Sequence, residues 1–255
     1  MKEIIVDDVT AKKYARRSLL AFVIFFLLLF AGYKAWHWLY TLPSDNGLQG
    51  GIQQPLRNGL NVNEKIFQGI FNQNKLVTEY DKTSAAKEVR VNGRLGLDTA
   101  FNAAAWKLQV VKSNGDTLHI SLDELKQMPK TEVVFNFKCI EGWSQVTWWG
   151  GVRFSDFAKK YGLDNEIRMQ YVGMRTPDKG YYVGIDMPSV LQPQTILCYE
   201  MNGARLPMNQ GYPLRLIIPV KYGIKHLKRI GIISFANEKP PDYWAEQGYD
   251  YYSGH

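Results

Sequence analysis

The longest hydrophobic run of the chain lies near the amino terminus. Residues 18–40 read SLLAFVIFFLLLFAGYKAWHWLY, and no charged residue occurs between Leu19 and Tyr33. A helix of about 20 apolar residues spans the hydrocarbon core of a bilayer. The cations that precede the run are Lys12, Lys13, Arg16 and Arg17. Because cations stay on the cytoplasmic side, the pattern predicts a cytoplasmic tail over residues 1–17, a transmembrane helix over 18–40 and an exported remainder.

A cleaved signal peptide is the alternative for the same run. Its apolar part is longer than the core of a typical signal peptide, and the bulky Trp36, Trp38 and Tyr40 follow where a cleavage site would need small residues. Both features favour a single-pass anchor that is held in membrane lipid, with the aromatic residues at the outer interface.

The hydrophobic pattern weakens after residue 40. Residues 41–62 are rich in Gly, Pro, Asn and Gln, a composition typical of a tether. Ile66, Phe67, Ile70 and Phe71 then recur at helical spacing. They predict an amphipathic helix near residues 64–76 that packs on the following domain or lies on the membrane. We therefore predict a linker over residues 41–88 that contains this helix.

Short strand and helix patterns occupy residues 89–255. Strand patterns occur at 106–112, 117–120, 169–182 and 214–235. Ser121 opens the capping box SLDE, and Ser155 is predicted to cap a second short helix that ends at Gly162. The chain shows no regular β-α-β alternation and no glycine-rich phosphate loop. The prediction is a mixed α+β domain of short strands and helices over residues 89–255.

One strand of this domain runs directly into a cysteine. Val133, Phe135 and Phe137 alternate with polar neighbours, and Cys139 follows at the strand end. The next residues, IEGWSQVTWWGG, supply aromatic side chains for a closed pocket beside one soft metal ligand. The alternative is a buried cysteine that acts as a small hydrophobic residue.

Charge and residue counts narrow the chemistry. The net charge of +7 suits nucleic acid, an acidic membrane surface or an anionic ligand, but no dense basic run or nucleic-acid-binding motif is present, so no nucleic-acid partner is predicted. The four histidines are scattered without zinc-ligand spacing. A nucleophilic pair of Cys139 and His226 is conceivable, but no third, orienting residue is apparent.

A second candidate segment lies at residues 199–228. It combines the Asn202-Gly203 turn with the cations Arg215, Lys225 and Lys228. Arginine binds phosphate in a bidentate manner and lysine adds a compact charge, so the segment fits a phosphate-bearing ligand. A solvated basic face is the alternative.

Three blocks of the chain resemble one known family. FKCIEGWS at 137–144, GYPLRLIIPVKYGIKHLK at 211–228 and PPDYWAEQGYDYYS at 240–253 occur in this order. They are similar to the sulfite-oxidase-type molybdopterin oxidoreductases, above all to the bacterial periplasmic branch of protein-methionine-sulfoxide reductase catalytic subunits. The resemblance implies a molybdenum centre held by one protein thiolate, Cys139, and by the dithiolene of a single molybdopterin. Soft thiolates suit such metals.

The resemblance also transfers further positions one at a time. Leu95 and Gly96 stand where the reductase has a Tyr-Glu pair, and Gln210 stands where relatives have Asn or His. The cofactor-binding residues that it implies are Asn92, Leu95, Gly96, Thr176, Gln210, Arg215, His226, Leu227 and Lys228. Arg215 would bind the pterin phosphate, and residues 226–228 would surround that phosphate.

Together these features predict an oxidoreductase that is anchored in the inner membrane and faces the periplasm or the exterior. It would carry out two-electron, oxygen-atom-transfer chemistry, either sulfoxide reduction or sulfite-like oxidation. A membrane cytochrome or another electron-transfer partner would exchange its electrons. Two alternatives stay open: a metal-free, membrane-tethered binding module that retains the fold, and a cysteine hydrolase.

Overall fold

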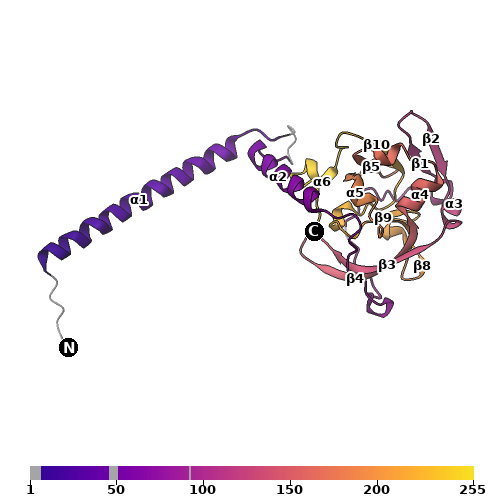
Figure 1. Cartoon of the computed structure of the whole chain (residues 1–255), viewed down its shortest axis with the longest axis horizontal. Helices are drawn as coiled ribbons and strands as arrows, with labels where there is room; N and C mark the ends of the chain where they lie inside the picture. Colours follow the sequence, from indigo (N-terminus) through magenta and orange to yellow (C-terminus); the bar gives the residue numbers. More distant parts are fainter. Residues whose placement is uncertain (1–6, 46–50, 92) are drawn as a thin grey trace. The chain divides into compact units, whose positions relative to one another are not determined.

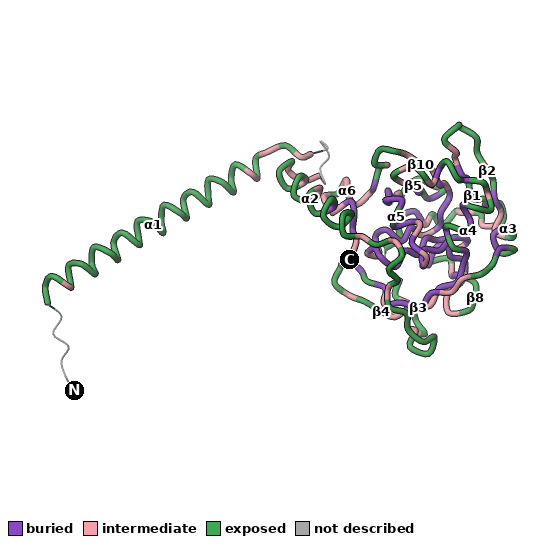
Figure 2. Tube along the Cα trace, viewed as in Figure 1, coloured by how far each residue is buried: buried purple, intermediate pink, exposed green. Residues whose placement is uncertain are grey.

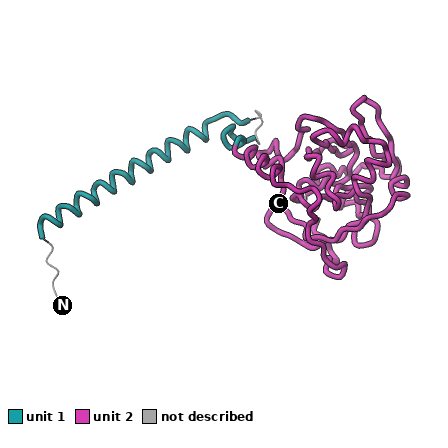
Figure 3. The backbone as a smooth tube through the Cα atoms, viewed as in Figure 1, with its two compact units in different colours: residues 1–58 teal, residues 59–255 magenta. Residues whose placement is uncertain are grey.

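The computed structural model describes residues 7–45, 51–91 and 93–255 of the chain. The chain divides into two compact units, residues 1–58 and residues 59–255, which Figure 3 colours separately. Each unit is considered by itself.

The first unit is dominated by one long helix, α1, Asp8–Thr41. Asp7 caps its start, because the Asp7 carboxylate accepts a hydrogen bond from the backbone N–H of Thr10 at 2.6 Å. Its residues are exposed along nearly all of the helix (Figure 2). With 34 residues α1 is about 50 Å long, and it is long and apolar enough to cross a membrane. Helix α1 begins before the transmembrane helix predicted over residues 18–40, because the basic segment that precedes residue 18 is also helical.

Helix α2, Gln54–Ile70, differs in its bounds from the helix predicted near residues 64–76. It begins earlier because Pro55 is tolerated in the first turn of a helix. It ends earlier because the chain after it becomes extended and bonds to the second unit. The backbone N–H groups of Val77, Tyr80 and Ala86 donate to Gln194 Oε1, Val134 O and Val146 O, at 2.8, 2.9 and 3.0 Å.

The linker predicted over residues 41–88 is therefore too long. The chain from Gly59 onward belongs to the second unit. Within it, residues 71–88 run along the strands as an extended segment with one short turn, η1, Lys82–Ser84. Residues 71–88 are largely polar, and no strand was predicted within them. Their backbone groups nevertheless find partners on the neighbouring strands, and this satisfies their hydrogen-bonding requirement.

The second unit contains two sheets (Figure 1). The first has the order β2-β1-β10-β5-β6 and is antiparallel except for the parallel pair β1 and β10. Its strands are β1 Leu108–Val111, β2 Thr117–Ile120, β5 Tyr171–Arg175, β6 Tyr182–Asp186 and β10 Ile232–Ala236. The second has the order β3-β4-β7-β8, with β9 also paired to β7. Its strands are β3 Thr131–Lys138, β4 Ser144–Arg153, β7 Ile196–Met201, β8 Ala204–Arg205 and β9 Arg215–Ile217.

Short helices connect these strands. They are α3 Leu122–Lys126, α4 Phe154–Lys160, α5 Met187–Val190 and α6 Tyr243–Glu246, with the 3₁₀ turns η2 Ala103–Ala105, η3 Glu166–Arg168, η4 Met208–Gln210 and η5 Gly223–Lys225. The predicted α+β class is confirmed. The predicted capping box is also present, because Glu124 N donates to Ser121 Oγ at 3.2 Å and Ser121 N donates to Glu124 Oε2 at 2.8 Å.

The predicted cap at Ser155 is wrong. Helix α4 begins at Phe154, and its N-cap is Arg153, whose side chain makes no capping hydrogen bond. The helix start is fixed by the core instead, since Phe154 is fully buried and its N–H donates to Thr195 O at 3.0 Å. Gly162 ends the segment with a φ of +61°, as its sequence position predicted.

A close approach between β4 and β7 shapes the second sheet. The pairing shifts at Gly150 and Gly151, and a Cβ on Gly151 would lie 2.1 Å from Leu197 O. Glycine is required there because any side chain would collide with backbone. In the resulting register Gly151 is paired with Cys198, and Cys198 is paired with Arg215 of β9. The sheet thereby packs Trp149, Cys198 and Ile217 into one buried cluster.

Candidate active site

A cavity of about 380 Å³ opens beside the second sheet. Its walls come from the β3–β4 hairpin, the start of β9, the segment 223–228, the carboxyl-terminal region and four earlier residues, Val89, Arg90, Gly93 and Leu95. The aromatic side chains that line it are Phe137, Trp143, Trp149, Tyr181, Trp244 and Tyr249. Rigid aromatic walls with a few polar groups are typical of ligand sites.

Cys139 lies in the hairpin loop at one side of this cavity. Strand β3 ends at Lys138, and the loop is closed by Cys139 N donating to Trp143 O at 2.9 Å and Gly142 N donating to Cys139 O at 3.1 Å. Gly142 takes a φ of +86°, which the tight turn requires. Cys139 is buried, while Phe137, Ile140 and Glu141 beside it line the cavity.

The surroundings of Cys139 keep its thiol protonated. Burial raises the pKa of the thiol, and the backbone N–H of Glu141 opposes that shift only in part. A nucleophilic cysteine has a lowered pKa in an electropositive site, so this environment does not suit one. A metal ion would instead displace the proton directly.

One polar and aromatic group stands beside the cysteine loop. Trp143 Nε1 donates to Glu141 Oε2 at 3.0 Å, and the Arg90 guanidinium lies 4.7 Å from the centroid of the Trp143 ring. Phe137 also stacks on the indole of Trp143, with ring centroids 5.9 Å apart. The sequence placed Trp143 near the cysteine, but nothing in it connected Arg90 to this residue.

Arg215 is a buried cation that lines the cavity. It is 2% exposed, and its guanidinium lies 4.5 Å from the centroid of the Trp149 ring. Nη1 donates to Gln210 O at 3.1 Å and to Gln210 Oε1 at 2.8 Å. Its Nε, although buried, makes no hydrogen bond to any of the residues that the structure describes. Burial lowers the pKa of Arg215 to about 10, so the group is still a cation at neutral pH.

The Gln210 side chain links Arg215 to the backbone of Val89 and Arg90. Its Nε2 donates to Val89 O at 3.1 Å and to Arg90 O at 3.3 Å, while its Oε1 accepts from Arg215. The Gln210 side chain therefore lines the cavity and also connects the wall formed by Val89 and Arg90 with the wall formed by Arg215.

Lys228 is the second cation of the site. It lines the cavity, and its Nζ donates to Gly93 O at 3.1 Å. Burial, together with repulsion from the Arg215 charge, lowers the pKa of Lys228 to about 7. The buried Arg215 and the partly exposed Lys228 both line the cavity, and together they favour an anionic ligand.

The prediction that Lys225 joins these two cations is wrong. Lys225 is 1% exposed and its Nζ lies 2.5 Å from Asp242 Oδ2 and 2.9 Å from Gly184 O, in a different buried cluster. The physical reason is the turn η5, which places Lys225 in the domain interior, where a buried ammonium requires a carboxylate partner.

His226 lines the cavity with a neutral ring. Nδ1 accepts a hydrogen bond from Ile218 N at 3.4 Å, so the proton resides on Nε2, which lies 3.1 Å from Lys221 O. Burial lowers the pKa of His226 to about 3. Both nitrogens bond to backbone, so neither is available as a base for Cys139, and the hydrolase alternative loses its general base.

The remaining candidate residues fall in different places. Leu95 lines the cavity, but Gly96 lies against Thr176, whose Cγ2 would be 2.3 Å from an added Cβ. Thr176 is buried, donates to Asp178 Oδ1 at 2.5 Å and accepts from Tyr181 N at 3.1 Å, so its hydroxyl builds the β5–β6 turn. Leu227 is fully buried in the core. Asn92 lies outside the described residues.

Comparison with known proteins shows which proteins are similar to the part of the chain that forms this cavity. The family model described as oxidoreductase molybdopterin-binding domain matches residues 95–244. A proposed protein-methionine-sulfoxide reductase subunit of Azospira oryzae, YedZ1, is 34% identical over 187 residues, which cover 72% of this chain and 70% of that protein. The protein-methionine-sulfoxide reductase catalytic subunit MsrP of Campylobacter jejuni is 29% identical over 170 residues, covering 60% of this chain and 57% of MsrP.

Among solved structures, the chain is similar to the sulfane dehydrogenase SoxCD from Paracoccus pantotrophus. That match has a TM-score of 0.49 and 16% identity, and it covers 55% of this chain and 40% of the other. The chain spans little more than half of the length of the MsrP proteins from Campylobacter jejuni and Xanthomonas campestris.

Proposed function

The chain belongs to the oxidoreductase molybdopterin-binding domain family, and on that premise we propose that it is the membrane-anchored catalytic part of a molybdenum oxidoreductase. The reaction is a two-electron oxygen-atom transfer on the exported side of the inner membrane. The names of its relatives favour reduction of methionine sulfoxide in proteins over sulfite-like oxidation. Electrons pass through a membrane cytochrome or another electron-transfer partner.

The observation that carries this proposal is the donor set around one cavity. The buried Cys139 lies in the β3–β4 loop next to the lining residues Ile140 and Glu141. The buried Arg215 and the partly exposed Lys228 line the same cavity. Arg215 Nε is a buried donor without a partner among the described residues, and leaving such a group unpaired costs about 1–3 kcal/mol. An anionic phosphate would satisfy it. The residues present therefore fit a ligand with a phosphate at one end and a metal at the other.

Each protein group would have a separate task. The bound molybdenum centre supplies a two-electron redox couple. Cys139 would bind the metal as a thiolate. Within residues 7–45, 51–91 and 93–255, no group of three His, Cys, Asp or Glu side chains is placed to hold a metal ion. Arg215 and Lys228 would bind the phosphate. Trp143, held by Glu141, Arg90 and Phe137, would exclude water and orient the substrate.

The direct test is analysis of the full chain purified in mild detergent from a bacterial host that synthesises molybdopterin. We expect about one molybdenum and one molybdopterin per chain, and reduction of methionine sulfoxide with an artificial electron donor. Protein that is free of metal and pterin would overturn the proposal and favour the tethered binding module. Loaded protein without sulfoxide reductase activity, but with sulfite oxidation, would overturn the reaction direction alone.

Binding of the cofactor phosphate should depend on pH through Lys228. Because its pKa is lowered to about 7, the side chain is charged below that pH and largely neutral above it. A phosphate monoester is already dianionic above about pH 6, so binding above pH 7 requires Lys228 to take up a proton. Molybdopterin affinity of the cofactor-free protein should therefore fall by up to about tenfold per pH unit between pH 7 and pH 9.

Fluorescence titration with molybdopterin at several pH values measures this dependence. Lys228→Arg is the matched control, because a guanidinium stays charged over this range and its affinity should remain nearly constant. A wild-type affinity that is constant from pH 7 to pH 9 would contradict the assigned role of Lys228.

A further inference from the structure

Over residues 59–70, which belong to the second unit, helix α2 presents its faces in the reverse of the usual arrangement. A surface helix normally buries its apolar stripe and exposes its polar side. In α2 the buried residue is Glu64, at 3% exposure, whereas Ile66 and Ile70 are 55% and 72% exposed. Figure 2 shows the helix as largely exposed. Val62, Ile66, Phe67 and Ile70 of α2, with Leu76 just after it, form an exposed surface that we call the apolar patch.

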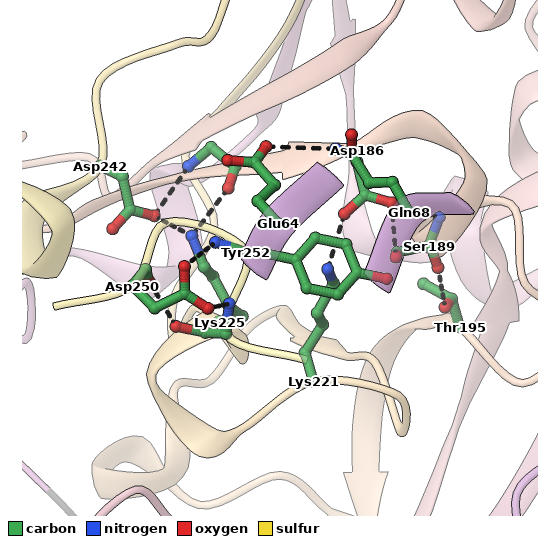
Figure 4. Close-up of polar contacts among 12 residues, drawn as sticks. Glu64, Gln68, Asp186, Ser189, Thr195, Lys221, Lys225, Asp242, Asp250 and Tyr252 are labelled. Carbon is green, nitrogen blue, oxygen red and sulfur yellow. Dashed lines mark hydrogen bonds and ion pairs between the residues drawn. The ribbon is translucent and has the colours of Figure 1, made fainter. Parts of the chain in front are cut away.

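Polar contacts fix this orientation of α2. The Glu64 carboxylate pairs with Lys239 and accepts a hydrogen bond from Gln68 Nε2 at 3.1 Å. Figure 4 shows Glu64 and Gln68 among the buried polar side chains of the domain, where Lys221 pairs with Asp186 at 2.6 Å. Rotating the helix to bury the apolar patch would break the Glu64–Lys239 ion pair and the hydrogen bond from Gln68.

The apolar patch continues into a groove of about 560 Å³. Phe67, Ile70 and Leu76 line it, and Phe67 stacks on Tyr252 with ring centroids 6.1 Å apart. Lys75 and Lys138 also lie on its walls. Contiguous exposed apolar surfaces of this kind mark contact sites, and cations beside them favour an anionic partner.

We propose that the apolar patch lies in the headgroup region of the membrane that α1 enters. This inference rests on the proposed function in one respect, namely that α1 spans the bilayer. Helix α1 ends at Thr41 and α2 begins at Gln54, so the connecting residues 42–53 reach at most about 40 Å even when fully extended. The patch is thus confined close to the bilayer surface.

The chemistry of the surface matches that location. Helices that lie in the membrane interface bury one apolar face among the lipids and carry lysine beside it for anionic headgroups. Val62, Ile66 and Ile70 supply the apolar face, and Lys65 and Lys75 are exposed next to it. The polar face, which bonds to the domain through Glu64, then connects the catalytic unit to the membrane surface.

Spin labels on the full chain test this inference. Single cysteines are introduced as Ile66→Cys or Ile70→Cys, since the native Cys139 and Cys198 are buried. The chain is reconstituted into vesicles of phosphatidylethanolamine and phosphatidylglycerol, and collisions with oxygen and with a water-soluble nickel chelate are compared. Labels at both positions are expected to shift toward oxygen, which concentrates in lipid. Molybdenum content, unchanged from wild type, verifies that each variant is folded.

Three further labels make the outcome decisive. Lys65→Cys lies about 100° around the helix from Ile66, and Lys159→Cys lies on α4, so both should favour the nickel chelate. Leu28→Cys reports on α1 independently. The inference is overturned if labels at 66 and 70 favour nickel as strongly as the label at 159, or if they are shielded from both reagents, which would indicate a second copy or another protein. A water-exposed Leu28 label would instead show that the membrane anchor itself was wrong.

Discussion

Replacing Cys139 by serine is expected to reduce turnover by more than about 100-fold, which exceeds the 10–100-fold typical of residues that only support a metal ligand. The serine hydroxyl is a harder and less acidic donor than the thiol, so it binds molybdenum poorly. The fold should change little, because the loop around Cys139 is closed by backbone hydrogen bonds to Trp143 and Gly142. Molybdenum per chain and kcat of the purified variant measure the effect.

Cys198→Ala is the matched control for this substitution. Cys198 is also fully buried, and burial raises its pKa to about 12, but it packs between β4 and β9 in the second sheet. We expect this variant to keep its molybdenum and to lose only part of its stability. Full turnover by Cys139→Ser, or loss of metal in Cys198→Ala, would show that the two cysteines have been assigned the wrong roles.

The second large effect is expected at Arg215. Arg215→Ala removes a charge-assisted contact to the cofactor phosphate that is worth roughly 1.5–3 kcal/mol, or about one to two decades in affinity. Arg215→Lys should restore only part of this, because an ammonium does not reproduce the planar donor arrangement and does not reach both oxygens of Gln210 as Nη1 does. Molybdopterin retention during a chelator challenge gives the affinity ranking.

Loss of stability must be separated from loss of binding in these variants. Arg175, which is exposed on β5, provides an arginine whose replacement by alanine should leave retention unchanged. Thermal unfolding of the cofactor-free proteins reports on the fold alone. Equal retention by Arg215→Ala, Arg215→Lys, Arg175→Ala and wild type would show that Arg215 does not bind the phosphate, and that the basic segment serves another purpose.

Local signals in the sequence predicted much of the second sheet. The alternation before Cys139 is strand β3, and the Asn202-Gly203 turn joins β7 to β8 with φ values of +52° and +74°. These features depend on neighbouring residues only, and their physical basis is short-range. The prediction that Arg215 and Lys228 lie together is also correct, since both line the same cavity.

The incorrect predictions concern long-range partners. Lys225 is three residues from Lys228, yet it pairs with Asp242, and sequence spacing cannot reveal such a partner. Arg90 was not singled out because its contact with Trp143 joins positions more than fifty residues apart. Residues 71–88 fell within the predicted linker of residues 41–88, because the strands to which they bond lie elsewhere in the chain.

The second sheet also determines the distance between the two ends of the ligand site. The Cys139 loop follows β3, and Arg215 begins β9; in the order of the described sheet, β4 and β7 lie between these two strands. The distance between the Cys139 loop and Arg215 is therefore set by the spacing of hydrogen-bonded strands. A register slip of one residue between two of these strands would displace one end of the site by about 3.3 Å. The close contact between Gly151 and Leu197 O fixes the register of β4 and β7. Insertions in this sheet should therefore be tolerated far less than insertions in the sheet β2-β1-β10-β5-β6.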